Sequence, residues 1–155
     1  MVVMIIATVA SISIFAINQA FDRRFLSEAE NLHAWLQQLS ERAALESAAY
    51  GVMSNEQGLQ AVVFYRQRWF EVVSPELFVF QGDAVLEWLS DQALPKPEKR
   101  DRNGKKQILP IIAVLPGGYT EPEAQLQLSF EDSDIGFSYR WQAEEGGVVM
   151  TRLEP

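Results

Sequence analysis

Hydrophobic residues follow two different patterns along the first third of the chain. Residues 1–17 are apolar on every side of a helix and contain no charged residue, proline or glycine. As a helix this run is roughly 26 Å long, slightly less than the ~30 Å hydrocarbon core of a bilayer. A membrane helix explains the run better than a signal peptide, which has a basic start and a small-residue cleavage site. It also explains it better than a core helix, because a small domain cannot easily cover a helix that is apolar all round.

From Phe21 onward the pattern becomes amphipathic. Apolar residues recur at spacings of three, four and seven, as on the buried stripe of a helix, and polar residues mostly fill the other positions. No proline or glycine interrupts the chain before Gly51, which is a typical helix stop signal. We therefore predict one helix from Met1 to about Tyr50. Its stripe is expected to pack on a sheet through Leu32, Trp35, Leu36, Leu39 and Ala43.

Short runs of strand-forming residues dominate the chain after Gly51. Residues 59–64 and 68–73 favour a hairpin that turns at YRQR, and residues 77–80 a third short strand. Residues 83–89 fit either a strand or a helical turn. AQLQLSF alternates as a half-buried antiparallel strand does. Further strands are predicted within 107–119, 123–130, 136–141 and 147–153.

These elements predict an α+β fold in which a long N-terminal helix packs on an antiparallel β-sheet domain. The second half of that domain is interpreted as a β-meander. We assign residues 1–20 to a transmembrane or assembly half-helix and residues 21–155 to a globular domain made of helix 21–50 and sheet 51–155. A length of 155 residues suits one domain with an anchor better than two domains.

Charge is distributed unevenly. The formal net charge is −8, from 21 acidic and 13 basic residues, and no acidic residue precedes Asp22. An acidic domain repels phosphate backbones, so we expect no nucleic-acid partner. Residues 95–106 hold six basic residues, and we favour a solvated loop there over an arm for an anionic partner. Arg23 and Arg24 follow the apolar run, so the positive-inside rule alone would leave the domain in the cytoplasm unless a basic segment precedes Met1.

Candidate chemistry is sparse. The chain has no cysteine, which excludes thiol nucleophiles, disulfides and cysteine-based metal sites. Its one histidine, His33, lacks the spacing of a metal-binding motif. We predict no catalytic residue, no cofactor and no metal site, and we favour core packing for the four tryptophans over an aromatic recognition groove. Pairs of acidic residues lie in predicted turns, where solvated acids are common: Glu121 with Glu123, Asp132 with Asp134, and Glu144 with Glu145.

The chain resembles type IV pilin-like proteins and, more narrowly, the H-type (GspH) minor pseudopilins of the type II secretion system. Residues 1–17 are similar to the apolar segment that follows the prepilin-peptidase site in that family, and residues 31–52 to the end of its long helix. Residues 110–128 and the strand pair that ends at Trp69 are similar to its strands. The family's cleavage motif, a glycine before an aromatic residue with a glutamate four residues after the aromatic, is absent. Aligning the apolar runs places it just upstream of Met1.

The resemblance implies a non-enzymatic subunit of the bacterial inner membrane, cleaved and methylated at its N-terminus, with its globular domain in the periplasm. Such subunits assemble through their apolar helices into a pseudopilus that pushes folded proteins through the outer membrane. H-type subunits join the tip complex to the major pseudopilin. The expected partners are other pseudopilins and the inner membrane, with secreted proteins as further candidates. During assembly, six side chains would exchange their contacts with lipid for contacts with the helices of neighbouring subunits: Val2, Ile5, Ile6, Val9, Ile12 and Phe15.

Two alternatives stay open. A minor type IV pilin of the FimT/FimU kind, acting in pilus assembly or DNA uptake, has the same architecture, and gene neighbours would distinguish it from a secretion subunit. A signal-anchored envelope binding protein would need a pocket with convergent polar groups, for which the sequence carries no motif. The DNA directly upstream of Met1 would identify the pilin class through an in-frame basic leader.

Overall fold

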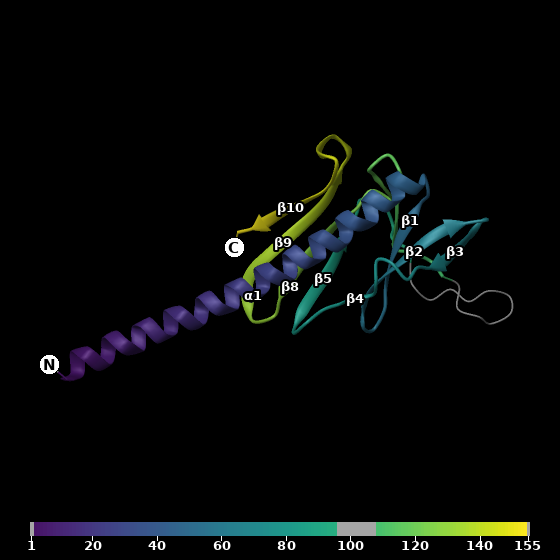
Figure 1. The fold of residues 1–155 in the computed structure, drawn as a ribbon. Coiled ribbons are helices and arrows are strands. Elements are labelled where there is room, and N and C mark those ends of the chain that lie inside the picture. Colours follow the sequence, from purple (N-terminus) through teal and green to yellow (C-terminus); the bar gives the residue numbers. More distant parts are fainter. Residues whose placement is uncertain (1, 96–107, 155) are drawn as a thin grey trace.

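One long helix and two antiparallel sheets make up the computed structural model (Figure 1). The structure describes residues 2–95 and 108–154, and their side chains from Asp22 onward. Helix α1 spans Val2–Glu46. Its first half projects away from the sheets and its second half lies across them (Figure 1). The loop predicted at residues 95–106 falls, beyond Pro95, outside the described residues.

The helix ends earlier than predicted, and Tyr50 is the first residue of strand β1 instead of the last of the helix. Ser47 has a left-handed conformation with φ 51° and stops the helix. The Ala48 N–H donates to the Ala43 carbonyl at 3.2 Å and the Ser47 N–H to the Ala44 carbonyl at 3.4 Å. These are the two bonds of a Schellman motif, which usually has glycine at the left-handed position. The predicted boundary was wrong because serine takes that position here.

The first sheet has the strand order β3-β2-β1-β6-β7, and β4 pairs separately with β2. The predicted hairpin at YRQR is confirmed: Tyr65 lies opposite Arg68, and Arg66 and Gln67 have φ 49° and 65°. Positive φ at both central residues is the geometry of a tight two-residue hairpin turn. The strands are β1 (Tyr50–Ser54), β2 (Gly58–Tyr65), β3 (Arg68–Glu71), β4 (Phe78–Val79), β6 (Ile112–Val114) and β7 (Thr120–Glu121).

The second sheet has the order β10-β9-β8-β5. Strands β8 (Gln125–Phe130), β9 (Ser133–Gln142) and β10 (Gly147–Leu153) are consecutive neighbours and form the predicted meander. A short 3-10 helix, Ala143–Glu145, links the last two. The segment at 83–89, which fitted two interpretations, forms strand β5 (Ala84–Leu89) and pairs with β8.

Two sheets replace the single sheet that the sequence suggested, because β6 and β7 leave the expected meander. Strand β6 pairs on one side with β7, the next strand in sequence, and on the other side with the distant strand β1, with Val114 opposite Tyr50. Pro110 and Pro116 bracket this strand and keep it short. Both Ile112 and Val114 are fully buried, and β6 lies between β1 and the edge strand β7 of the first sheet. Hydrophobicity indicated a strand here but carries no information about its partner.

The core lies between α1 and the two sheets. Both sheets contribute large side chains that are almost wholly removed from solvent, and these meet one stripe of the helix. Strand β8 shows the predicted alternation, since Leu126 and Leu128 are fully buried between half-exposed glutamines. Other core members from the strands are Tyr50, Val52, Leu59, Ala61, Phe130, Phe137, Tyr139 and Val148.

Candidate functional site

The buried face of α1 joins the helix to the domain. The structure places the five residues expected on this face in the core. Four of them have no exposed surface, and Trp35 is 7% exposed. The four residues without exposed surface are Leu32, Leu36, Leu39 and Ala43. The helix and the sheets therefore share one apolar interior, and a force applied along the helix is transmitted through close-packed side chains.

Trp35 also fastens the helix to the first sheet by a hydrogen bond. Its indole N–H donates to the carbonyl of Glu76 at 2.7 Å, in the connection between β3 and β4. Its ring is tilted against Phe78, with ring centroids 6.2 Å apart. A buried tryptophan normally finds such a partner for its N–H, because an unpaired donor costs free energy in the interior.

Two side chains of α1 cover the edge of the second sheet. His33 Nε2 donates to the carbonyl of Val148 at 2.7 Å, and the Val148 N–H donates to Gln37 Oε1 at 2.8 Å. They occupy the positions that a neighbouring strand would fill. Gly147 allows this approach, because a Cβ there would lie 2.3 Å from Gln37 Oε1. His33 thus bonds the backbone of β10.

Two buried polar groups lie where α1 enters the domain. Glu28, one of the polar residues between the apolar positions of the helix pattern, is only 9% exposed and accepts a hydrogen bond from the Gln81 N–H at 2.7 Å. The Tyr139 hydroxyl donates to the Ala29 carbonyl at 2.7 Å. Burial raises the pKa of Tyr139 above its ordinary value, and the charge of Glu28 raises it further. The 3.6-residue periodicity of the helix could not reveal that Glu28 is buried, because the residues that cover its side chain come from a loop distant in sequence.

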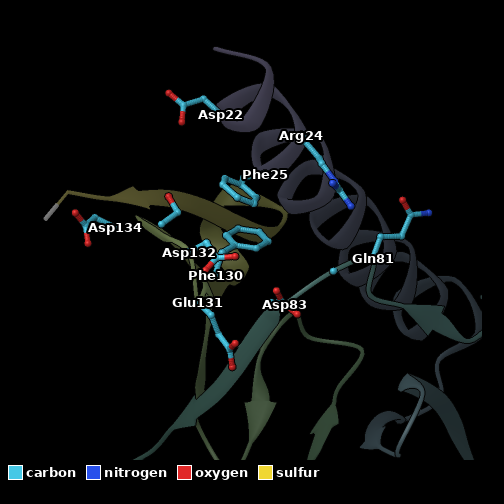
Figure 2. A pocket seen from close by; sticks show the side chains of 11 residues that line it. Asp22, Arg24, Phe25, Gln81, Asp83, Phe130, Glu131, Asp132 and Asp134 are labelled. Atoms are coloured by element: carbon cyan, nitrogen blue, oxygen red, sulfur yellow. The ribbon is translucent and has the colours of Figure 1, made fainter. Parts of the chain in front are cut away.

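A pocket of about 470 Å³ lies between residues 22–25 of α1 and the turn from β8 to β9, and its lining includes Gln81, which donates to Glu28 (Figure 2). Phe25 of the helix stacks on Phe130 of β8 with centroids 4.3 Å apart and forms an aromatic wall. Five exposed carboxylates and one arginine surround it, and within the described part of the chain none of these carboxylates forms an ion pair. They are Asp22, Asp83, Glu131, Asp132 and Asp134, with Arg24.

The tip of the β2–β3 hairpin is the second exposed feature. Phe64, Tyr65 and Phe70 are 42%, 57% and 45% exposed, although aromatic side chains usually lie inside. Arg66 lies over the ring of Tyr65, 5.2 Å from its centroid. The Phe64 N–H donates to the Ala49 carbonyl at 2.8 Å, which places the hairpin beside the end of α1.

A further hollow of about 760 Å³ lies between β5, β8 and β9. Its lining includes Gln125, Arg140 and Trp141, but Arg140 Nε donates to Gln125 Oε1 at 2.7 Å, so these polar groups pair with each other. Trp141 stacks on Trp88 with centroids 6.5 Å apart. Core packing was predicted for all four tryptophans; Trp35 is buried, and Trp69, Trp88 and Trp141 are half-buried.

The acidic pairs do not converge on a metal-ion geometry. Asp132 and Asp134 line the pocket of Figure 2, and Glu123 lines the larger hollow. Glu144 and Glu145 lie in the exposed 3-10 turn. Among the described residues, no three His, Asp or Glu side chains are arranged to hold a metal ion.

The predicted membrane and assembly residues lie on the projecting half of α1. Val2, Ile5, Ile6, Val9, Ile12 and Phe15 belong to the helix, but their side chains fall outside the described residues. In the part of the chain that the structure describes, no helix combines the length and apolarity needed to cross a membrane.

Comparison with known proteins rests on structure. No family model matches the chain, and no curated protein matches it in sequence. Two solved structures of the minor pseudopilin EpsH, from the type II secretion system of Vibrio cholerae, share its fold. One is 17% identical and matches 79% of this chain and 92% of its own, with a TM-score of 0.56. The other is 18% identical over 82% and 91%, also with a TM-score of 0.56. The predicted pilin-like α+β fold is thereby confirmed.

Proposed function

We propose that this chain is an H-type minor pseudopilin of the type II secretion system, a non-enzymatic structural subunit that links the tip of the pseudopilus to its shaft. The observation that carries the proposal is the fold shared with EpsH over about four fifths of the chain. The architecture supports it as well, because one continuous helix both projects from the domain and supplies a face of its core.

In this proposal the two halves of α1 have separate tasks. Residues 1–20 anchor the subunit in the inner membrane and later pack against neighbouring subunit helices. Helix packing there depends on close fit more than on exclusion of water, because lipid is as apolar as the side chains. The second half is clamped to the sheets through Leu36 and its buried neighbours, so that axial displacement of the helix moves the periplasmic domain as a rigid body.

Deletion of the gene in its host bacterium tests the proposal. We expect folded exoproteins to accumulate in the periplasm, and the wild-type chain supplied in trans to restore their appearance in the medium. A chain lacking residues 2–17 should not restore secretion, because it cannot join the helical assembly. Normal secretion combined with loss of surface pili would contradict the proposal and identify a minor type IV pilin.

Cysteine cross-linking tests the assembly half of the helix. Because the chain has no native cysteine, each of its disulfide products must involve the engineered residue. With Val9→Cys, we expect disulfide products with pseudopilins that carry a cysteine in their own apolar helices. Gln38→Cys is the matched control, since Gln38 lies exposed on the same helix within the globular domain. Equal yields from the two variants would show that the products arise from random collision.

A further inference from the structure

The exposed hairpin tip, defined here as residues 64–70, presents an unusual amount of aromatic surface. Phe64 and Trp69 are a cross-strand pair on one face of the hairpin, with ring centroids 5.1 Å apart. Tyr65 and Phe70 are exposed on the other face. Exposed aromatic side chains that lie together are typical of the anchor residues of protein interfaces, so this surface is a candidate for contact with another molecule.

The hairpin tip also carries positive charge that the chain itself does not neutralise. Arg66 and Arg68 are exposed, and no residue from 57 to 70 is acidic although the net charge is −8. Within the described part of the chain, neither guanidinium forms an ion pair. Glu46, at the nearby end of α1, already pairs with Arg42 at 3.6 Å. The two arginines are therefore available to the carboxylates of a partner.

The backbone holds these side chains in a defined arrangement. Arg66 and Gln67 form a two-residue turn with φ 49° and 65°, and Tyr65 lies opposite Arg68 across it. The Arg66 guanidinium lies 5.2 Å from the centroid of the Tyr65 ring. Because a short turn and paired rings have little conformational freedom to lose, binding through this surface carries a small entropic cost.

The hairpin tip lies at the end of the domain that is far from the projecting half of α1 (Figure 1). The Phe64 N–H donates to the Ala49 carbonyl at 2.8 Å, just after the helix ends at Glu46. From Val2 to that end the helix is about 68 Å long. In the proposed function residues 1–20 lie in the membrane or the shaft, so the hairpin tip faces the far end of the pseudopilus.

We propose that the hairpin tip docks on a different pseudopilin, a subunit of the tip complex, at a surface where carboxylates surround an apolar patch. The inference rests on the proposed function, in which this chain lies between the shaft and the tip, so that its neighbour on the tip side is another kind of subunit. It adds to that function the surface that makes the contact and the chemistry of the surface that receives it.

Position and charge together select this occupant. The inner membrane lies at the other end of α1, which removes anionic lipid from reach. At a net charge of −8 a second copy and nucleic acid are both repelled, and the carboxylate-rich pocket of this chain lies at the opposite end of the domain, against residues 22–25.

The two components of the hairpin tip have different tasks in this contact. Arg66 and Arg68 suit a carboxylate-bearing surface because the planar guanidinium can bind both oxygens of one carboxylate. Exposed ion pairs contribute little affinity by themselves. The arginines therefore select the partner, and burial of Tyr65 and Phe70 supplies most of the affinity.

Photo-cross-linking in secreting cells identifies the partner. The full chain, with p-benzoylphenylalanine at the position of Gln67, is expressed in the gene-deletion strain, where the other secretion subunits are present. We expect a product in which mass spectrometry identifies a tip-complex pseudopilin other than this chain. The same amino acid at the position of Thr151, which is exposed on β10, is the matched control and should not give that product. A product with a second copy, the major pseudopilin or a secreted protein, or equal yields from both positions, would overturn the proposal.

Charge reversal tests the chemistry of the contact. Arg66→Glu with Arg68→Glu, added to the photo-reactive chain, should lower the yield of the product about tenfold. Arg140→Glu with Arg152→Glu makes the same change in net charge on the second sheet and should leave the yield unchanged. All four positions are exposed, so the thermal midpoints of both variants should stay close to wild type and a lost product reflects a lost contact. An unchanged yield from the hairpin-tip variant would refute the role of the arginines.

A gel-shift assay with duplex DNA covers the other class of partner that arginine and aromatic side chains suit. We expect no binding at physiological salt, and binding that disappears with Arg66→Glu and Arg68→Glu would show that nucleic acid is the occupant. If the Gln67 product is absent while the Val9→Cys cross-links and secretion persist, this inference alone fails and the proposed function stands. If secretion is normal after gene deletion, the proposed function fails and the inference fails with it.

Discussion

Replacement of Leu36 by aspartate should unfold the globular domain and leave residues 1–20 able to insert in a membrane. Leu36 has no exposed surface and lies in the core between α1 and the sheets. Removing its side chain from the interior costs about 2–5 kcal/mol, including the cavity that remains. Burial can raise the pKa of the new carboxyl by about 3–5 units, which adds roughly 4–7 kcal/mol at neutral pH. The total, about 6–12 kcal/mol, is comparable with the whole stability of a typical domain.

Near-ultraviolet circular dichroism of the full chain in detergent, followed through a thermal scan, measures the effect. We expect Leu36→Asp to lose its cooperative transition at pH 7 while membrane extraction still requires detergent. Gln38→Asp is the control, because it introduces the same charge on an exposed face of the same helix and should change stability by about 0.5 kcal/mol or less. A Leu36→Asp transition within a few degrees of the control would refute the packing argument.

The pH dependence of this variant follows from the sign of the pKa shift. A buried aspartate has a folded-state pKa above its unfolded value of about 3.9, so the destabilisation grows as the pH rises above that value. Below it the carboxyl is protonated in both states, and only the loss of the leucine side chain remains. We therefore expect Leu36→Asp to regain part of its transition near pH 4, relative to Gln38→Asp at the same pH.

Further substitutions test three particular contacts by the midpoint of thermal unfolding. Gly147→Ala should destabilise the chain by about 1–3 kcal/mol, because a Cβ would lie 2.3 Å from Gln37 Oε1, and Gln37→Ala should relieve part of that loss. Tyr139→Phe should cost about 0.5–1.5 kcal/mol through the hydrogen bond to the Ala29 carbonyl. Because folding raises the pKa of Tyr139, its unfolded phenol ionises first above about pH 10, and this variant should lose less stability there than wild type. Trp35→Phe should cost about 1 kcal/mol by removing the indole hydrogen bond, and an unchanged midpoint would show that water replaces it.

Much of the architecture could be predicted from local pattern. The amphipathic stripe from Phe21 to Ala43 indicates the buried face of the helix, because a helix turns in register with its own sequence. The hairpin at residues 58–71 was predictable for the same reason, since its two strands and turn are adjacent in sequence. The resemblance to pseudopilins likewise uses local segments, and the fold confirms its architectural part.

The helix end and Glu28 escaped prediction for reasons that are physical. Ser47 stops the helix without the expected glycine, by hydrogen bonds that close on Ala43 and Ala44. Glu28 has the residue type of a solvent-facing position, but the segment around Gln81 covers it and supplies an N–H. Neither the position of the helix end nor the burial of Glu28 changes the hydrophobic periodicity of the sequence.

The sequence by itself determined the long helix, most of the strands, which face of the helix is apolar, and that no acidic residue precedes Asp22. Only the tertiary structure decided that strand β6 crosses back to β1, that Phe25 meets Phe130, and that five carboxylates gather at one end of the domain opposite an aromatic, arginine-bearing tip. The reason is that periodicity reports local burial, whereas strand pairing and surface clustering join residues distant in sequence through contacts that no single segment encodes.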